Sequence, residues 1–235
     1  MIQITLFKND IKQIMRDPIM AILLFAPLLL ITVFKLLEIF LVPFLAAKLS
    51  FDLAPYSAYI LSFILLMNSG MLGIVTGFMM LDERDGNISQ LLEVTPLGRG
   101  GYLINRLTFA SLLSIIYCFI SIAVFDQPFL PFFTIVLLSA LSAIYTAIIG
   151  LLIFSGADDK VKGLTFAKGL NTLVIFAFTD LFALSWLTFL SWLFPPYWIT
   201  LIIKSPYSIA FASVGLLVHA LWLGILIFRY TKRES

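Results

Sequence analysis

The sequence is poor in charge and in side chains that hold metals or form disulfides. Charged residues make up 12% of its 235 residues, and it has one cysteine, Cys118, and one histidine, His219. Soluble domains carry about 25% charged residues. One cysteine excludes a disulfide within the chain, and one cysteine with one histidine gives no credible metal site. The net charge of +2 is too small to indicate a nucleic-acid partner.

The sequence also lacks a phosphate-binding loop of the form G-x-x-x-x-G-K-[ST]. In that loop, backbone N–H groups and the lysine hold the phosphates of a nucleotide. The nearest glycine pair, Gly156 and Gly163, flanks Asp158, Asp159 and Lys160 without the pattern. We therefore expect no ATP site, no cofactor and no enzymatic activity on this chain.

Apolar residues are abundant instead: they make up 61% of the chain, and its mean hydropathy is +1.07. A water-soluble fold of this size could not bury so much apolar surface. Six stretches almost free of charge have lengths near the roughly 20 residues that cross a bilayer as a helix. They are residues 19–34, continued past Lys35 to Val42, then 53–81, 107–125, 127–157, 169–203 and 205–228. The prediction is an all-α integral membrane protein, a single domain over 1–235 with a six-helix bundle over 18–230.

The basic residues predict how these spans are oriented. With six spans, both ends of the chain lie on one side of the membrane. Of the 15 Lys and Arg residues, only Lys35, Lys48 and Lys204 fall on the opposite side. Because basic residues concentrate in cytoplasmic loops, we expect both termini in the cytoplasm and the protein as a multi-pass component of the cell membrane.

Residues 2–17 have the pattern of an amphipathic helix that lies on the membrane surface. Apolar residues recur at helical spacing along one face, and basic residues recur every four positions along another. The apolar positions are Ile4, Phe7, Ile11, Ile14 and Met15, and the basic ones are Lys8, Lys12 and Arg16. Such a helix directs its cations toward headgroup phosphates, and Pro18 ends it. It is either a general membrane anchor or an elbow that positions the first span against a cytoplasmic partner.

The segment after the second span carries the most information about function. Four charged residues in a row, Asp82, Glu83, Arg84 and Asp85, end the span, and Gly86 permits a reversal of the chain. Asn87 followed by Gln90 is typical of a capping box that starts a new helix. Ile88, Leu91 and Leu92 then form a short apolar stripe, and Glu93 lies before Pro96, which ends the helix. The stripe either docks in a groove of a soluble partner or belongs to a connector that lies on the membrane surface.

Together these features resemble the ABC type-2 (ABC-2) permease family, the membrane half of one class of ATP-binding-cassette exporters. The resemblance covers nearly the whole chain. It rests on Arg16-Asp17-Pro18, on Gly70, Gly73 and Gly77 in the second span, on Leu81-Asp82-Glu83-Arg84-Asp85-Gly86 with Leu91-Leu92, on Thr95-Pro96-Leu97 and on Tyr102-Leu103.

The resemblance implies that the loop over residues 83–97 contains a coupling helix that docks on an ATPase. The residues it assigns to coupling are Asp82, Glu83, Arg84, Asp85, Asn87, Ile88, Gln90, Leu91, Leu92 and Glu93. It also implies a second permease half, identical or sibling, and two ATPase subunits that carry ATP and Mg²⁺. A break after the fifth span is implied as well, and Pro195-Pro196-Tyr197-Trp198 and Lys204-Ser205-Pro206 suit it.

Three polar residues within or beside the predicted spans are candidates for a translocation pathway: Asp180, Lys204 and His219. If the fifth span is unbroken, Asp180 lies within the bilayer, where charges are costly and often functional. Otherwise it pairs with Lys204 across a broken helix near the outer end. A lone histidine such as His219 is more often hydrogen-bonded to a neighbouring helix than catalytic.

The glycines of the second span, Gly70, Gly73 and Gly77, recur at intervals of three or four residues. Small residues at this spacing let another helix approach closely. The close contact lies either within the chain or between two permease halves.

The predicted function is the permease subunit of an ATP-driven exporter. Its cargo is lipophilic or amphipathic, such as a drug, a lipid or a membrane-active peptide, because no site for a soluble sugar or polar metabolite is visible. A proton-coupled secondary transporter that uses Asp180 stays open as an alternative, and so does a membrane scaffold or immunity protein that transports nothing. Recovery of an ATPase with the purified protein distinguishes the exporter from the secondary transporter. The scaffold or immunity protein predicts no cargo-dependent phenotype when the ATP site of that partner is disabled.

Overall fold

The computed structural model describes residues 10–86, 98–125, 130–182 and 184–233. In these residues every element of secondary structure is helical, and six helices are long and apolar enough to cross a membrane, which confirms the predicted fold class. The first four spans are α2 (Pro18–Leu49), α3 (Ser57–Asp85, after the 3-10 turn η1 at Ala54–Tyr56), α5 (Gly98–Val124) and α6 (Phe132–Gly156). The fifth is α7 (Lys160–Asn171) continued by the 3-10 helix η2 (Thr172–Phe182), and the sixth is α10 (Ile209–Arg233). Two short helices, α8 (Ser185–Ser191) and α9 (Pro195–Lys204), precede the sixth.

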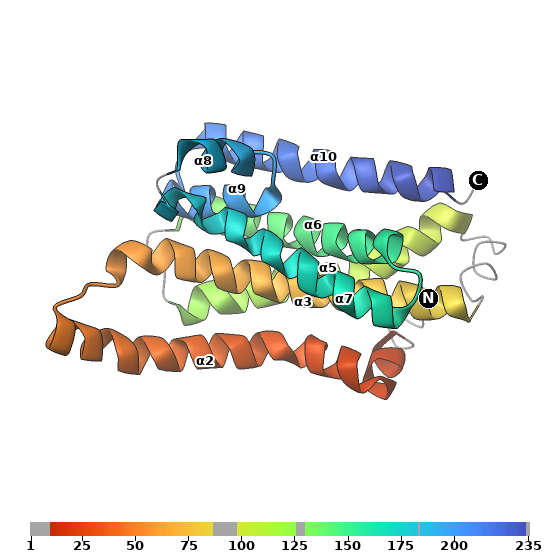
Figure 1. Ribbon diagram of the computed structural model, residues 1–235, viewed down its shortest axis with the longest axis horizontal. Helices are drawn as coiled ribbons and strands as arrows, with labels where there is room; N and C mark the ends of the chain where they lie inside the picture. The colour runs from red at the N-terminus through yellow and green to blue at the C-terminus, as the bar shows by residue number, and fades with distance from the viewer. Residues whose placement is uncertain (1–9, 87–97, 126–129, 183, 234–235) are drawn as a thin grey trace.

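Helices α3 and α6 form the centre of the bundle, and α2 and α10 lie at opposite edges (Figure 1). In the most apolar stretch of each span, 72% of the residues of α3 and 67% of those of α6 are buried, against 22% for α2 and 17% for α10. The start of α2, the end of α3, the start of α7 and the end of α10 lie at one end of the bundle (Figure 1), which we call the termini end. Both ends of the six-span unit therefore lie on the same side.

Glycines allow α3 and α6 to pack this closely. A Cβ atom on Gly73 would lie 2.7 Å from Cβ of Ile149 and 2.8 Å from the carbonyl oxygen of Thr146. One turn later, a Cβ atom on Gly77 would lie 2.7 Å from Cβ of Ile153. Real Cβ atoms do not approach so closely, so only glycine fits at these positions. The close contact at Gly73 and Gly77 thus lies within the chain, between α3 and α6. Gly70, the third glycine of the predicted seam, faces Asn171 of α7 instead.

The first span continues past Lys35, as predicted, but it ends at Leu49 rather than at Val42. Lys35 donates a hydrogen bond to Glu38 at 3.0 Å on the same helix. The predicted start of the third span is wrong, because it was set after a charged residue that lies inside the helix. The helix α5 begins at Gly98 and includes Arg106, whose side chain is buried. A charge with a partner satisfies its own hydrogen bonds and need not mark the end of a span.

The prediction of a fifth span over 169–203 is also wrong. The fifth span ends with η2 at Phe182, and residues 185–204 form the pair α8 and α9, bent by 105°. Helix α9 begins at Pro195 and ends at Lys204, where the sequence predicted breaks. Pro195 and Pro196 lack the N–H groups that would continue α8, but they suit the first turn of a new helix.

Two tryptophans hydrogen-bond the carbonyl groups that this bend exposes. The indole N–H of Trp198 donates to the carbonyl oxygen of Trp192, and that of Trp222 on α10 donates to the carbonyl oxygen of Leu193, both at 2.8 Å. Unpaired backbone groups are costly in hydrocarbon. The two indoles therefore stabilise a bend that lipid would otherwise disfavour, and Trp222 ties it to the last span.

The glycine seam yields a stability prediction. Gly73→Ala should destabilise the protein by about 1–3 kcal/mol, since the added methyl group overpacks the contact with Ile149. The apparent melting temperature in detergent should fall by several degrees. Gly224→Ala on α10 is the matched control, because a Cβ atom there meets nothing within 4 Å. An unchanged melting temperature for Gly73→Ala would contradict the seam.

Candidate functional site

The last turn of α3 carries four consecutive charged residues, and we call the first three, Asp82, Glu83 and Arg84, the charged segment. Successive residues of an α-helix point about 100° apart, so three in a row face different neighbours. Glu83 is 2% exposed, whereas Asp82 and Arg84 are partly exposed. Asp85, the next residue, is exposed. Each residue of the charged segment contacts a different part of the bundle.

Glu83 lies in a buried cluster with Arg106 and Tyr102 of α5 and with Asp10. Arg106 donates from Nε to Oε2 of Glu83 at 2.7 Å and from Nη2 to Oε1 at 2.5 Å. The hydroxyl of Tyr102 donates to Oε2 of Glu83 at 2.8 Å. Nη1 of Arg106 donates to Oδ1 of Asp10, which lies on the helical residues 10–16. Because both carboxylates contact the same guanidinium, the cluster links residues 10–16, α3 and α5 to one another.

Burial raises the pKa of Asp10 above its ordinary value, although the positive charge of Arg106 acts in the opposite direction. Arg106 is the shared partner of the two buried carboxylates, and its own side chain is only 6% exposed. Removing one partner of such a pair leaves an uncompensated buried charge. The cluster is thus stable only as a whole.

Asp82 connects α3 to α2 and α7. Nζ of Lys160, at the start of α7, lies 2.8 Å from Oδ2 of Asp82 and 2.5 Å from Oδ2 of Asp17. Asp17 is also the N-cap of α2 and accepts hydrogen bonds from the N–H groups of Ile19 and Met20. Partial burial opposes its ionisation, but the hydrogen bonds from Lys160 and the backbone hold its pKa below the ordinary value. Lys160 therefore joins the starts of two spans to the end of α3.

Arg84 connects α3 to the end of α6. Its Nη2 donates to the carbonyl oxygens of Ala157 at 2.9 Å and of Asp158 at 2.5 Å. Its guanidinium also lies over the ring of Phe154, 5.1 Å from the centroid. The last carbonyl groups of a helix lack partners within the helix, and a cation there is favourable. Through its three charged residues, the end of α3 contacts α5, α6 and α7, and it reaches the start of α2 through Lys160.

Some of the predicted coupling residues lie within the part of the chain that the structure describes, and the others lie outside it. Asp82, Glu83, Arg84 and Asp85 are described, and the structure brings the first three into the contacts above. Asn87, Ile88, Gln90, Leu91, Leu92 and Glu93 lie outside the described residues. The predicted coupling helix itself therefore stays a prediction, and what the structure shows is the framework to which it is attached.

The described part of the predicted elbow, residues 10–16, is helical. Lys12 and Arg16 are exposed, as expected of cations near headgroups, and Lys8 lies outside the described residues. Ile14 is fully buried, whereas Ile11 and Met15 are about half exposed, at 48% and 53%. The face toward the bundle is thus formed by Asp10 and Ile14 rather than by all the apolar positions. In the sequence, the acidic Asp10 stands among the apolar positions of this helix, and this was the signal that could have indicated its contact with the bundle.

At the opposite end of the bundle, Lys204 pairs with Asp180. Nζ of Lys204 lies 3.0 Å from Oδ2 of Asp180 and donates to the hydroxyl of Tyr59 at 2.9 Å. Asp180 is near the end of η2, and its side chain is 21% exposed. The sequence left two positions open for Asp180, one within the bilayer and one paired with Lys204. The structure shows the position paired with Lys204. The contact joins α3, η2 and α9.

His219 is fully buried in α10, and its Nδ1 lies 2.7 Å from the carbonyl oxygen of Gly215 one turn earlier. Its Nε2 has no hydrogen-bond partner among the described residues. The expected bond to a neighbouring helix is therefore wrong, because the bond lies within α10. The structure does not bring His219 together with Asp180 or Lys204 through any contact of the described residues.

Sequence reasoning used Arg106 only as a boundary between spans, and it assigned no role to Asp10, Asp17, Tyr102 or Lys160. Asp10 and Arg106 are 96 positions apart in the sequence, and Lys160 and Asp17 are 143 apart. Nothing in local spacing indicates such pairs. Arg106 did carry a signal, because it lies one turn after Tyr102 on the same helical face.

The chain is an ABC-2 type permease, and its six-span bundle is consistent with that class. The chain belongs to the Rv2686c-like family of fluoroquinolones export permease proteins, whose model matches residues 10–227. Two relatives, both named fluoroquinolones export permease protein, come from the CDC 1551 / Oshkosh and H37Rv strains of Mycobacterium tuberculosis. Each is 30% identical over 201 residues, which cover 81% of this chain and 77% of the relative. The chain is accordingly a multi-pass transport subunit of the cell membrane rather than an enzyme.

The buried cluster can be tested by removing its cation. Arg106→Ala leaves Glu83 and Asp10 buried without their partner, which should cost about 3–5 kcal/mol. The apparent melting temperature in detergent should drop by about 6–20 °C, given the size of the chain.

The control for this variant is Lys162→Ala, which removes a partner of Asp158 in a pair whose side chains are 62% and 77% exposed. Exposed pairs contribute little to stability, so this variant should melt like the wild type. Equal effects of the two substitutions would show that the buried cluster does not hold the termini end together.

Proposed function

We propose that this chain pairs with a second permease half and two ATPase subunits to export an amphipathic compound from the cytoplasm or the inner leaflet. ATP and Mg²⁺ bind to the ATPase subunits. The coupling helix lies after Gly86, within residues 83–97, and the termini end faces the cytoplasm, in agreement with the excess of basic residues on that side. The ATPase drives the permease between two arrangements of its spans.

The contacts of the charged segment support this proposal most strongly. Residues 87–97 follow Gly86 directly, and Asp82, Glu83 and Arg84 lie within the turn before it. A force on residues 87–97 therefore reaches α3 at the point where it contacts residues 10–16, α5, α6 and the Lys160 bridge to α2 and α7. Partner binding at one site would bias the positions of most of the spans.

The energetic requirement is that the ATPase interacts differently with two arrangements of the bundle, since otherwise nucleotide could not shift their populations. Buried charge clusters suit this role, because they favour discrete arrangements in which every charge is paired. Packing of apolar side chains against lipid distinguishes such arrangements far less. The charged segment is thus the part of the permease that can respond to the partner as a unit.

The names of the two relatives make fluoroquinolones the first cargo to test on this chain. These relatives share 30% identity with it, so we propose the wider class of aromatic, amphipathic drugs. The bend before α9 is rich in aromatic rings. The rings of Phe176 and Phe194 stack with their centroids 4.0 Å apart, and the ring centroids of Phe194 and Trp222 are 5.9 Å apart. Planar aromatic compounds can stack on such rings.

The coupling proposal can be tested by changing the apolar stripe of the coupling helix. In Ile88→Asp combined with Leu91→Asp, the ATPase subunit should no longer be recovered with the permease in mild detergent. ATP-dependent uptake of a fluoroquinolone into inverted vesicles should fall to the background level, while the amount of permease in the membrane stays the same. The conservative control, Ile88→Val with Leu91→Met, should keep both properties. Recovery of the ATPase with the double aspartate variant would refute the assignment.

The secondary-transporter alternative makes the opposite prediction for Asp180. If Asp180 carries a proton, Asp180→Asn abolishes transport and removes its dependence on a proton gradient. The structure pairs Asp180 with Lys204 at 3.0 Å, so we expect the variant to keep ATP-driven transport with at most a modest loss. Uptake measured with an uncoupler, with and without ATP, separates the two mechanisms. Transport that survives without ATP but not without the gradient would favour the alternative.

A further inference from the structure

The buried cluster that joins residues 10–16 to α3 and α5 contains more acid than base. Asp10 and Glu83 are its two acids, and Arg106 is the one basic residue that contacts either of them in the described part of the chain. Tyr102, the fourth member, donates its hydroxyl to Glu83 and carries no charge. The side chains of Asp10, Glu83 and Arg106 are 1%, 3% and 6% exposed, so they are shielded from water. With both acids ionised, the cluster would bury one unmatched negative charge, which is strongly disfavoured.

The hydrogen bonds of the two acids differ, and the difference indicates which one is neutral. Both oxygens of Glu83 accept hydrogen bonds, two of them from Arg106 and one from Tyr102, and three donors suit an ionised carboxylate. Asp10 accepts one, at Oδ1, from Nη1 of Arg106. Its Oδ2 is buried and has no hydrogen-bond partner among the described residues. An unpaired neutral hydroxyl at that position costs much less than an unpaired anionic oxygen.

Among the described residues, the groups around Asp10 supply no second positive charge. The titratable groups that share its cluster are Glu83 of α3 and Tyr102 and Arg106 of α5. The described cations of its own helix, Lys12 and Arg16, are exposed to solvent instead. A proton on Asp10 is therefore the simplest way to make the cluster neutral.

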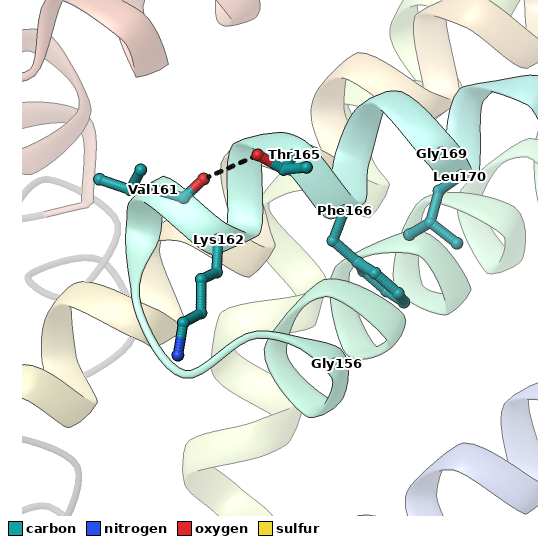
Figure 2. A pocket seen from close by; sticks show the side chains of 7 residues that line it. All are labelled: Gly156, Val161, Lys162, Thr165, Phe166, Gly169 and Leu170. Atoms are coloured by element: carbon teal, nitrogen blue, oxygen red, sulfur yellow. Dashed lines mark hydrogen bonds between the residues drawn. The ribbon is translucent and has the colours of Figure 1, made fainter.

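Other acids at the termini end differ from Asp10, because water reaches them. Asp17 and Asp82 also share one lysine, but their side chains are 25% and 34% exposed. Lys162, directed toward the connection between α6 and α7 in Figure 2, pairs with Asp158 where the two side chains are 62% and 77% exposed. Among the acids that the structure describes, only Asp10 has a buried side-chain oxygen without a hydrogen-bond partner. Burial raises the pKa of Asp10 above its ordinary value, in agreement with a retained proton.

We propose that Asp10 holds a proton on Oδ2 at neutral pH, and that loss of this proton releases the helix of residues 10–16 from α3 and α5. The ionised acid would add a second negative charge beside Glu83. Turning the helix outward returns that charge to water, but it breaks the contact with Arg106 and uncovers Ile14, which lies one turn after Asp10 on the same face. The helix is thus attached to the bundle at acidic and neutral pH and detached at alkaline pH. This switch belongs to the permease itself and depends on neither a cargo nor an ATPase.

The dependence of stability on pH tests for the proton. The folded chain keeps a proton that the unfolded chain loses above the ordinary Asp pKa of about 3.9, so this stabilisation is complete below that pH and is lost as the pH rises through the raised pKa of Asp10. The equilibrium constant for unfolding in detergent should therefore increase by up to about tenfold per pH unit. Asp10→Asn, which resembles the protonated acid and keeps an oxygen for Arg106, should remove most of this increase. Asp158→Asn, at an exposed acid, should keep it. Equal slopes for the wild type and Asp10→Asn would overturn the proposal.

Infrared spectroscopy detects the proton directly. At neutral pH the wild type should show the carbonyl band of a protonated carboxylic acid, which Asp10→Asn lacks and which disappears at alkaline pH. Glu83→Gln should lack the band too, because Asp10 would then be the only acid beside Arg106 and would ionise. A band that persists in Asp10→Asn and disappears in Glu83→Gln would assign the proton to Glu83 and overturn the proposal.

Release of the helix can be measured by thiol labelling in a Cys118→Ala background. Ile14→Cys places a thiol at a fully buried position, and Ile11→Cys, at a position 48% exposed on the same helix, corrects for the effect of pH on the reagent and the thiol. The ratio of the two labelling rates should rise severalfold from neutral to alkaline pH, and it should stay constant when Asp10→Asn is added. A constant ratio without Asp10→Asn would overturn the proposal. So would a melting temperature that responds to sodium or potassium at constant ionic strength but not to pH, because a metal ion would then replace the proton.

Discussion

The arrangement of the termini end depends on keeping the charge of Glu83 paired while it is buried. A carboxylate without hydrogen-bond donors is strongly disfavoured away from water. Glu83 receives donors from Arg106 and Tyr102, and buried Arg106 needs Asp10 to balance its second amino group. The helix of residues 10–16 is thus placed by an ionic requirement. In lipid this matters more than in water, because apolar side chains gain little by leaving acyl chains for one another.

Helix α3 is held along its entire length by a different interaction at each level. The charged segment holds it at the termini end, Gly73 and Gly77 hold it against α6 in the middle, and Tyr59 meets Lys204 at the far end. At the seam the backbone of α3 lies so close to Ile149 and Ile153 that not even a methyl group fits between them. Helices α3 and α6 therefore form a stiff central pair, against which the outer spans can be repositioned.

The fold was predictable because lipid imposes one simple requirement, namely apolar helices of sufficient length. All six spans follow from that requirement. The errors arose where a buried charge has a partner of its own, as Arg106 does, or where tertiary bonds stabilise a bend, as Trp198 and Trp222 do between α8 and α9. The charged segment was visible in the sequence, but its partners were not, since they come from residues that are far apart in the chain. Pairing of that kind is decided by packing, which a single sequence does not encode locally.

The stiffness of α3 and α6 bears on how an ATPase could act through this permease. If α3 cannot slide against α6, a displacement of the charged segment is not absorbed within the central pair. It passes instead to the elements that share its charges, namely residues 10–16, α5 and the Lys160 bridge between α2 and α7. Helix α2 is only 22% buried in its most apolar part, so little packing opposes its movement. In the exporter that we propose, the moving part is therefore the rim of the bundle, and the central pair serves as the support against which it moves.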